Sequence, residues 1–223
     1  SMLLKDLGRI SEAVELAEKS LEITEESYGR DSVDTFYRLN NVAVLYAEGK
    51  DYKKALGINH SLHSRLQGKF GEAHPLTMVS ANNYADCLLR TGSTIDALSI
   101  LESNLGIYKD LFGANHPDTL RTLNNLAGVY EDMGEHEKST SLLAECVERY
   151  EESMGSMHPS TLISISNFAI TLGERGEYER SVTLHRTCYE RRIQALGSTH
   201  LDTLESLYGC LLYTSDAADD TPC

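Results

Sequence analysis

The stretch Phe112–Gly134, FGANHPDTLRTLNNLAGVYEDMG, decides the fold because the chain repeats it at a fixed spacing. Glycine, alanine and an asparagine pair all recur every 42 residues, the interval from Gly71 to Gly113. The copies are Gly29, Gly71, Gly113, Gly155 and Gly197; Ala43, Ala85, Ala127 and Ala169; and Asn40-Asn41, Asn82-Asn83 and Asn124-Asn125, with Ser166-Asn167 as an altered fourth pair. Self-similarity at such a period indicates a stacked array of structural repeats.

Each copy predicts two helices joined by a glycine turn. His-Pro pairs at 74–75, 116–117 and 158–159 mark helix starts, because proline suits the first helical position. We expect first helices at about 32–47, 75–90, 117–132 and 159–174, and second helices at about 51–68, 93–111, 135–153 and 177–195. The first repeat has Ser32-Val33 in place of His-Pro, so we expect its helix start to be looser.

The repeat spacing also gives the domain organisation. We expect a partial repeat at 2–29, full repeats at 30–71, 72–113, 114–155 and 156–197, and a partial repeat at 198–209. The string CLLYTSDAADD at 210–220 resembles the translation of a transposase adapter used in sequencing libraries. We therefore expect an adapter-derived segment there, a short tail at 221–223, and a chain that is a fragment of a longer protein. The alternative for 210–220 is a degenerate capping helix.

Composition limits the classes of partner. The formal net charge is −14, which disfavours nucleic acid and anionic membrane surfaces because both are negatively charged. No apolar run approaches the length of a membrane span. The five cysteines are odd in number and form no C-x-x-C pair, which favours a reducing compartment. We expect a cytoplasmic protein.

Catalytic and metal-binding patterns are not expected in this sequence. The regular histidines His74, His116, His158 and His200 cannot share an ion, since equivalent helices in a stack lie about 8–10 Å apart. We interpret them as helix-start residues. The sequence contains no G-x-S-x-G, phosphate-binding glycine loop or H-E-x-x-H. We therefore predict no catalytic residue, no metal site, no cofactor and no enzymatic activity.

The pattern Leu-Asn-Asn-Leu-Ala-x-x-Tyr, followed by a glycine turn and a second small residue, resembles the tetratricopeptide repeat (TPR). The longer form G-x-x-H-P-D-T-L-x-x-x-N-N-L-A resembles the repeats of kinesin light chains. It also resembles arrays appended to nucleotide-binding signalling ATPases. The resemblance covers residues 2 to about 209. It implies an all-α, right-handed superhelical solenoid of antiparallel helix pairs, with a concave groove lined by the first helices.

The resemblance also implies where a ligand would bind. The predicted groove residues are Tyr37, Asn40, Val79, Asn82, Asp86, Arg90, Arg121, Asn124, Ser166 and Ile170. An amide side chain both donates and accepts, so the first asparagine of each pair could hold a peptide backbone. The alternative is that the amides tie neighbouring helices together, which we expect for the second asparagine. When the far end of the groove is included, two basic residues, Arg90 and Arg121, face five acidic ones, so we expect a neutral or basic ligand rather than an acidic one. The five acidic residues are Glu48, Asp86, Glu131, Asp132 and Glu174.

The expected function is that of a protein–protein interaction scaffold or adaptor, which binds an extended peptide or a partner helix in the groove. Two alternatives stay open. The array could be a sensor or oligomerisation segment of a larger nucleotide-binding signalling ATPase, or it could be a passive spacer. Exposed stacking faces at the ends of the array could also support end-to-end self-association.

Overall fold

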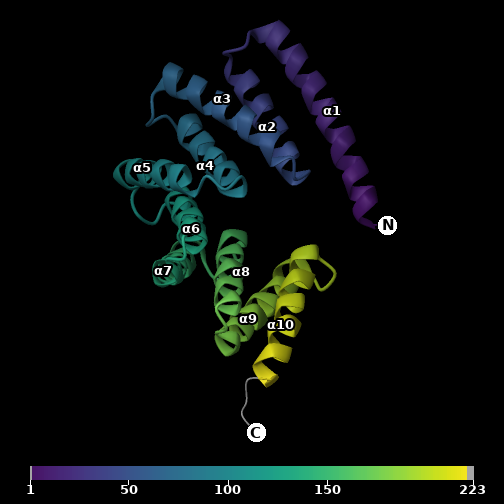
Figure 1. The fold of residues 1–223 in the computed structure, drawn as a ribbon, viewed down its shortest axis with the longest axis vertical. Coiled ribbons are helices and arrows are strands. Elements are labelled where there is room, and N and C mark those ends of the chain that lie inside the picture. Colours follow the sequence, from purple (N-terminus) through teal and green to yellow (C-terminus); the bar gives the residue numbers. More distant parts are fainter. Residues whose placement is uncertain (1, 220–223) are drawn as a thin grey trace. The chain divides into compact units, whose positions relative to one another are not determined.

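The structure is a computed structural model that describes residues 2–219, with side chains described for residues 9–214. All secondary structure in the described residues is helical (Figure 1). The helices are α1 (Met2–Tyr28), α2 (Val33–Glu48), α3 (Tyr52–Phe70), α4 (Pro75–Arg90), α5 (Thr94–Phe112), α6 (Pro117–Asp132), α7 (His136–Met154), α8 (Pro159–Glu174), α9 (Tyr178–Leu196) and α10 (Leu201–Asp219). This confirms the predicted all-α fold of helix pairs. Among these residues, no helix combines the length and apolar character needed to span a bilayer.

The chain divides into two compact units, residues 1–107 and 108–223, with the division inside α5. In the first unit α1 packs on α2, α2 on α3, and α3 on α4. In the second unit α6 to α10 pack in chain order, and α10 also contacts α8. Within each unit a helix therefore packs mainly against its sequence neighbours, as in a repeat array.

The recurring histidines act as helix caps. The Nδ1 atom of each ring accepts a hydrogen bond from the backbone N–H two residues later, at 3.1–3.3 Å, in His74, His116, His158 and His200. This confirms the helix-start interpretation of the four histidines. In the first repeat Ser32 Oγ accepts from the backbone N–H of Thr35 at 3.1 Å. The expectation of a looser start there is wrong, because serine is itself a strongly preferred N-cap.

Small residues line the seam between the two helices of a pair. The four repeated alanines, Ala43, Ala85, Ala127 and Ala169, are fully buried. In the second unit Ala127 forms a core cluster with Leu143, Phe168 and Leu172. Ser181 Oγ donates to the carbonyl of Ala169 at 2.7 Å, so a small polar residue also fits this seam. A methyl group at these positions lets the two backbones approach closely.

The last helix, α10, continues through the point where the repeat pattern ends. Leu201–Asp219 is helical without interruption, so this helix includes most of the predicted adapter segment. The ring of Tyr213 stacks near His185, with ring centroids 5.8 Å apart. It also covers Gly173, where an added Cβ would meet the tyrosine ring. The origin of 210–220 stays a prediction, and Asp220 and the tail at 221–223 lie outside the described residues.

Candidate ligand-binding surface of the first helices

The asparagine pairs of the first unit bind one another. Asn83 Nδ2 on α4 donates to Asn40 Oδ1 on α2 at 2.8 Å. Asn104 Nδ2 on α5 donates to Asn82 Oδ1 at 3.1 Å and to the Met78 carbonyl at 2.9 Å. Asn82 is only 2% exposed. Its buried amide therefore stabilises the packing of α4 on α5 and is not accessible to a ligand. We remove Asn82 from the candidate contact surface. The alternative interpretation, that amides tie helices together, describes these contacts.

The other predicted residues of the first unit are more accessible. Tyr37 on α2 is 55% exposed, and Val79 on α4 is half-buried. Asp86 and Arg90, one turn apart on α4, form an ion pair at 3.7 Å with both side chains about half exposed. Asp86 and Arg90 thus form an accessible polar surface on α4, and Tyr37 is an accessible aromatic residue on α2.

In the second unit, Arg121 lies at the start of α6. Its Nη2 donates to Asp118 Oδ1 at 2.8 Å, so its charge is offset locally. Asn124, one turn further along, is half-buried, and its Oδ1 has no hydrogen-bond partner among the described residues. Arg121 and Asn124 thus lie on one helix but differ in their hydrogen bonding. The Arg121 guanidinium is paired with Asp118, whereas Asn124 Oδ1 has no partner among the described residues.

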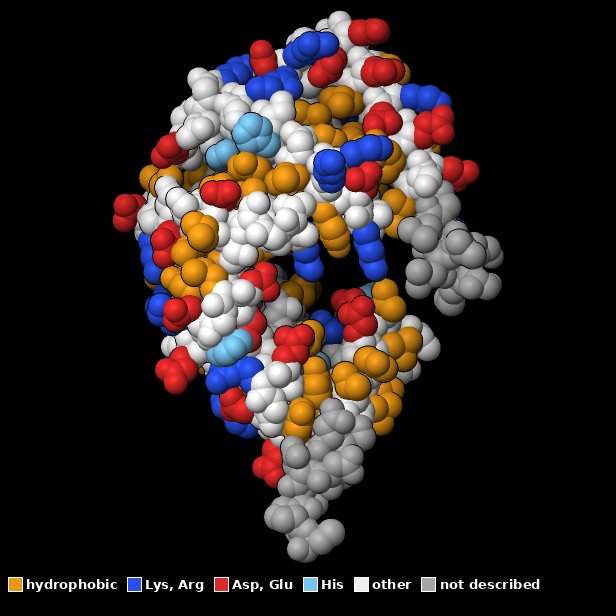
Figure 2. Space-filling model, in the orientation of Figure 1, with side chains coloured by type: hydrophobic (Ala, Val, Ile, Leu, Met, Phe, Trp, Pro, Cys, Tyr) orange, Lys and Arg blue, Asp and Glu red, His pale blue; other side chains and the backbone are white. Residues whose placement is uncertain are grey.

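Ser166 and Ile170 line a cavity of about 570 Å³ between α8 and α10. The facing side chains of α10 are largely apolar, and Leu201, Leu204 and Tyr208 are 46–68% exposed. Figure 2 shows hydrophobic side chains gathered over α10. The other lining residues are His185, Glu205, Gly209, Leu212 and Tyr213. Ligand pockets typically have volumes of about 300–1,000 Å³ with a mainly apolar lining, so this cavity is large enough to receive a side chain or more.

The wall formed by α10 is held in place by an arginine of α9. Arg192 Nη1 donates to the Asp202 carbonyl at 2.7 Å and to Ser206 Oγ at 2.8 Å, and its side chain is buried. A charged hydrogen bond of this kind fixes the start of α10 against α9. Sequence reasoning missed this half of the cavity, because Tyr208-Gly209 departs from the asparagine-pair pattern that defined the groove.

His185 on α9 is a buried polar residue in the lining of this cavity. It is 2% exposed, and neither ring nitrogen has a hydrogen-bond partner among the described residues. Burial lowers the pKa of the His185 ring, and the nearby positive charge of Arg192 lowers it further. A neutral imidazole can donate one hydrogen bond and accept another. The repeat spacing offered a signal for this residue, since the equivalent positions of the two preceding repeats hold Leu101 and Leu143.

Comparison with known proteins agrees with this architecture. The sequence profile of the tetratricopeptide repeat matches residues 1–59, 76–152 and 118–193. No curated protein sequence matches the chain.

Several solved structures share the fold. A protein described as a kinesin light chain of Podosopora anserina, with nearly identical TPR-like repeats, has 21% sequence identity and a TM-score of 0.66, covering 84% of this chain and 88% of that one. BtubC (BKLC) from P. vanneervenii has 17% identity and a TM-score of 0.69, covering 98% and 85%. A Rap protein complexed with Competence and Sporulation Factor has 14% identity and a TM-score of 0.70, covering 98% and 63%. The profile matches and the repeated helix pairs show that the chain belongs to the tetratricopeptide repeat family.

Proposed function

We propose that this chain is a protein–protein interaction scaffold whose ligand is an extended peptide or a partner helix. The ligand would bind on the first-helix surface, the surface formed by the first helices of the repeats, at the cavity between α8 and α10. The cavity between α8 and α10 carries the proposal, because it brings the predicted residues Ser166 and Ile170 against exposed apolar side chains of α10. An apolar side chain of the ligand would enter this cavity. Burying one leucine-sized side chain contributes about 1.5–3 kcal/mol, enough for it to act as an anchor.

Charge supports a neutral or basic ligand. The two arginines predicted on this surface are each paired, Arg90 with Asp86 and Arg121 with Asp118, so neither offers a strong attraction to an acidic ligand. Glu205 lines the cavity, and the chain as a whole has a net charge of −14. An acidic ligand would meet like charge, which slows encounter and costs affinity.

The fold also supports a binding role. A Rap protein of similar fold has been solved as a complex with Competence and Sporulation Factor. That complex supports ligand binding as one use of this architecture. A cytoplasmic location fits the proposal and rests on the cysteine pattern alone.

The test uses immobilised full chain and three labelled ten-residue peptides with a central leucine, flanked by lysine, serine or glutamate. We expect the lysine and serine peptides to bind more tightly than the glutamate peptide. The variant Ile170→Glu/Leu204→Glu should lose at least tenfold in affinity, since it places two charges where the apolar anchor would lie.

The matched control is Ile95→Glu, a charge substitution at a 76% exposed isoleucine on α5, which should bind like the parent. Melting curves on all three proteins verify folding. Equal binding by the cavity variant and the parent would exclude this cavity as the site. A spacer without a ligand predicts that no peptide of the panel binds.

A further inference from the structure

An arginine of the second helix holds the loop before its own first helix in three repeats. Arg65, Arg149 and Arg191 are related by the repeat spacing. Each guanidinium donates to a loop carbonyl: Arg65 to Arg30, Arg149 to Ala114 at 3.4 Å, and Arg191 to Ser156 at 3.4 Å. The three acceptor carbonyls are also related by the repeat spacing, so this contact is a regular feature of the array.

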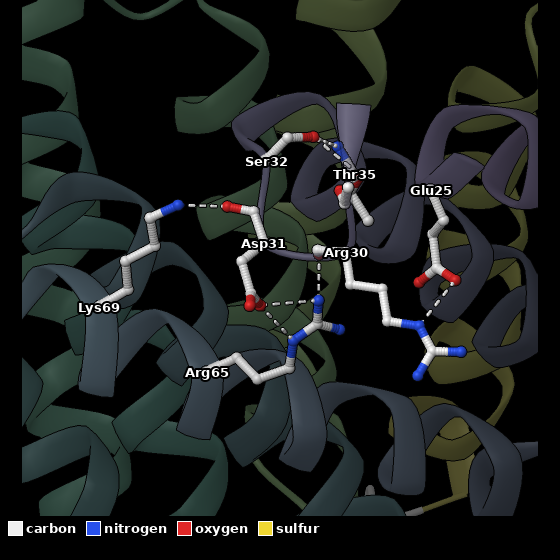
Figure 3. A network of polar contacts seen from close by, with 8 residues as sticks. Glu25, Arg30, Asp31, Ser32, Thr35, Arg65 and Lys69 are labelled. Atoms are coloured by element: carbon white, nitrogen blue, oxygen red, sulfur yellow. Dashed lines mark hydrogen bonds and ion pairs between the residues drawn. The ribbon is translucent and has the colours of Figure 1, made fainter. Parts of the chain in front are cut away.

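Figure 3 shows this contact in the first full repeat. Arg65 Nε donates to Asp31 Oδ1 at 3.1 Å, and Lys69 donates to the Asp31 carbonyl. Arg149 reaches Asn115 Oδ1 at 3.5 Å, and Arg191 pairs with the Glu151 carboxylate. In every case the loop presents carbonyl or side-chain oxygens to a cation. The loop geometry therefore favours a guanidinium group at this place.

The repeat at 72–113 lacks this arginine, because Ile107 occupies the position. The carbonyl that a guanidinium would meet is that of Glu72. A second contact is missing from the same repeat. In the other repeats a threonine Oγ1 donates to the carbonyl of the turn glycine at 2.7–2.9 Å, through Thr35, Thr119, Thr161 and Thr203. Thr77, their counterpart, is 1% exposed, and its hydroxyl has no partner among the described residues.

A cavity of about 180 Å³ lies at this place in the first unit, between α3, α5 and the start of α4. Ile107, Glu72 and Thr77 all line it. The remaining lining residues are His63, Gln67, Ala81, Ser99, Ile100, Ser103 and Asn104. A water molecule occupies about 30 Å³ of liquid volume, so the cavity exceeds what a single water fills and can accommodate a guanidinium group.

The lining offers mostly hydrogen-bond acceptors. The Glu72 carboxylate carries a negative charge, and the hydroxyls of Thr77, Ser99 and Ser103 can each accept. Gln67 Nε2 donates to Glu72 Oε1 at 2.9 Å, which leaves the other carboxylate oxygen for a ligand. Burial lowers the pKa of His63, whose Nδ1 lies 3.0 Å from Ser80 Oγ, so this ring favours its neutral form. No fixed positive charge lines the cavity.

We infer that this cavity binds the guanidinium group of an arginine from a protein partner. The group would lie against the Glu72 carboxylate and the Thr77 hydroxyl, beside the loop whose equivalent carbonyl is contacted by the chain's own arginine in three other repeats. The inference does not rest on the proposed function. Thr77 and Ala81 are each two residues, or about 200° around the helix, from Val79, so they face away from the candidate first-helix surface.

The test is a titration of isotope-labelled full chain, followed by nuclear magnetic resonance. The probes are N-acetyl-arginine amide and N-acetyl-citrulline amide, which have nearly the same shape but differ in charge. We expect the arginine probe to shift the resonances of Thr77, Ser103 and Ile107, and the citrulline probe to bind at least tenfold more weakly. That ratio corresponds to the loss of one charge-assisted hydrogen bond.

Two variants and two control variants test the inference further. Glu72→Gln removes the carboxylate at an exposed position and should weaken arginine binding about tenfold, whereas Glu26→Gln, an exposed control on α1, should not. Ile107→Arg supplies the guanidinium from the chain itself, so it should raise the melting temperature and abolish binding of the probe. Ile170→Glu/Leu204→Glu should leave probe binding unchanged, which separates this cavity from the first-helix surface.

Three results would overturn the inference. The first is equal affinity for arginine and citrulline. The second is the absence of shifts at these residues at any probe concentration, which would mean that the cavity holds only water. The third is full probe binding by Ile107→Arg.

Discussion

The asparagine cluster of the first unit and the α8–α10 cavity of the second unit lie at corresponding places in the repeat but differ in their hydrogen bonding. In the first unit Asn82, Asn83 and Asn104 satisfy one another or neighbouring helices. In the second unit Ser166 takes the place of the first asparagine, and the buried His185 has no partner among the described residues. A repeat position therefore fixes where a side chain lies, while its identity decides whether it forms a hydrogen bond within the fold.

The largest expected effect comes from removing the polar group at the centre of the asparagine cluster. Asn104→Ala leaves Asn82 Oδ1 and the Met78 carbonyl without this donor in a buried site. Each hydrogen bond lost contributes about 0.5–1.5 kcal/mol, so we expect the two losses together to lower the free energy of unfolding of the first unit by about 1–3 kcal/mol. Urea denaturation measures the loss, and hydrogen exchange of α4 amides locates it.

The matched substitution is Cys146→Ala in the second unit, at the same repeat position. The Cys146 thiol makes only a long contact, 3.6 Å, to the Leu120 carbonyl. A thiol is a weak hydrogen-bond donor, so removing it takes little stabilisation from the Leu120 carbonyl. Cys146→Ala should therefore lower the free energy of unfolding by less than Asn104→Ala does. Equal losses for the two variants would contradict the view that the asparagines hold the first unit together.

The sequence was sufficient for the fold because the repeat carries redundant signals. The expected first helices at 75–90, 117–132 and 159–174 coincide with α4, α6 and α8, since His-Pro marks each start and a glycine turn follows each end. The expected second helices end within two residues of the observed ones, as for 68 against Phe70. These boundaries depend on local chemistry, which the sequence displays directly.

The candidate sites were less predictable because they depend on exceptions between repeats. Which of two adjacent asparagines faces the interior depends on helix rotation and on Asn104, a residue of another helix. Ser166 and Ile170 were predicted, but the wall opposite them comes from α10, where the repeat signature is lost. The significance of Ile107 could not be predicted from the sequence. It becomes clear only because the structure shows Arg65, Arg149 and Arg191 in contact with equivalent loops.

A change in pH is expected to have an intermediate effect on the free energy of unfolding of the second unit, through His185 in the α8–α10 cavity. Because the pKa of His185 is lowered in the folded state from its ordinary value of 6.5, the unfolded chain takes up the proton first as pH falls. The stability contributed by the neutral ring is therefore complete above about pH 7 and is lost as pH falls below about 6.5, by at most about 1.4 kcal/mol per pH unit. Urea unfolding of the second unit between pH 7.5 and 5 measures this slope.

The control is His185→Leu, which installs the residue that the preceding repeat carries. The parent and the variant share all other titrating groups, so the difference between their slopes belongs to His185. We expect a shallower slope for the variant. Parallel slopes would mean that the ring is charged or solvated in the folded protein, and its assignment as a neutral polar group of the cavity would be wrong.

The smallest effect is expected from the exposed pair Asp86–Arg90 on α4. Its atoms lie 3.7 Å apart and both side chains are about half exposed, so solvent screens the attraction. A double-mutant cycle of Asp86→Ala and Arg90→Ala should give a coupling of about 0.3–0.5 kcal/mol, the range for exposed pairs one helical turn apart. A coupling above about 1 kcal/mol would show that the pair stabilises α4. A small coupling has the more useful consequence: the fold does not need these charges, so any change in ligand affinity caused by either substitution reports contact with the ligand rather than loss of structure.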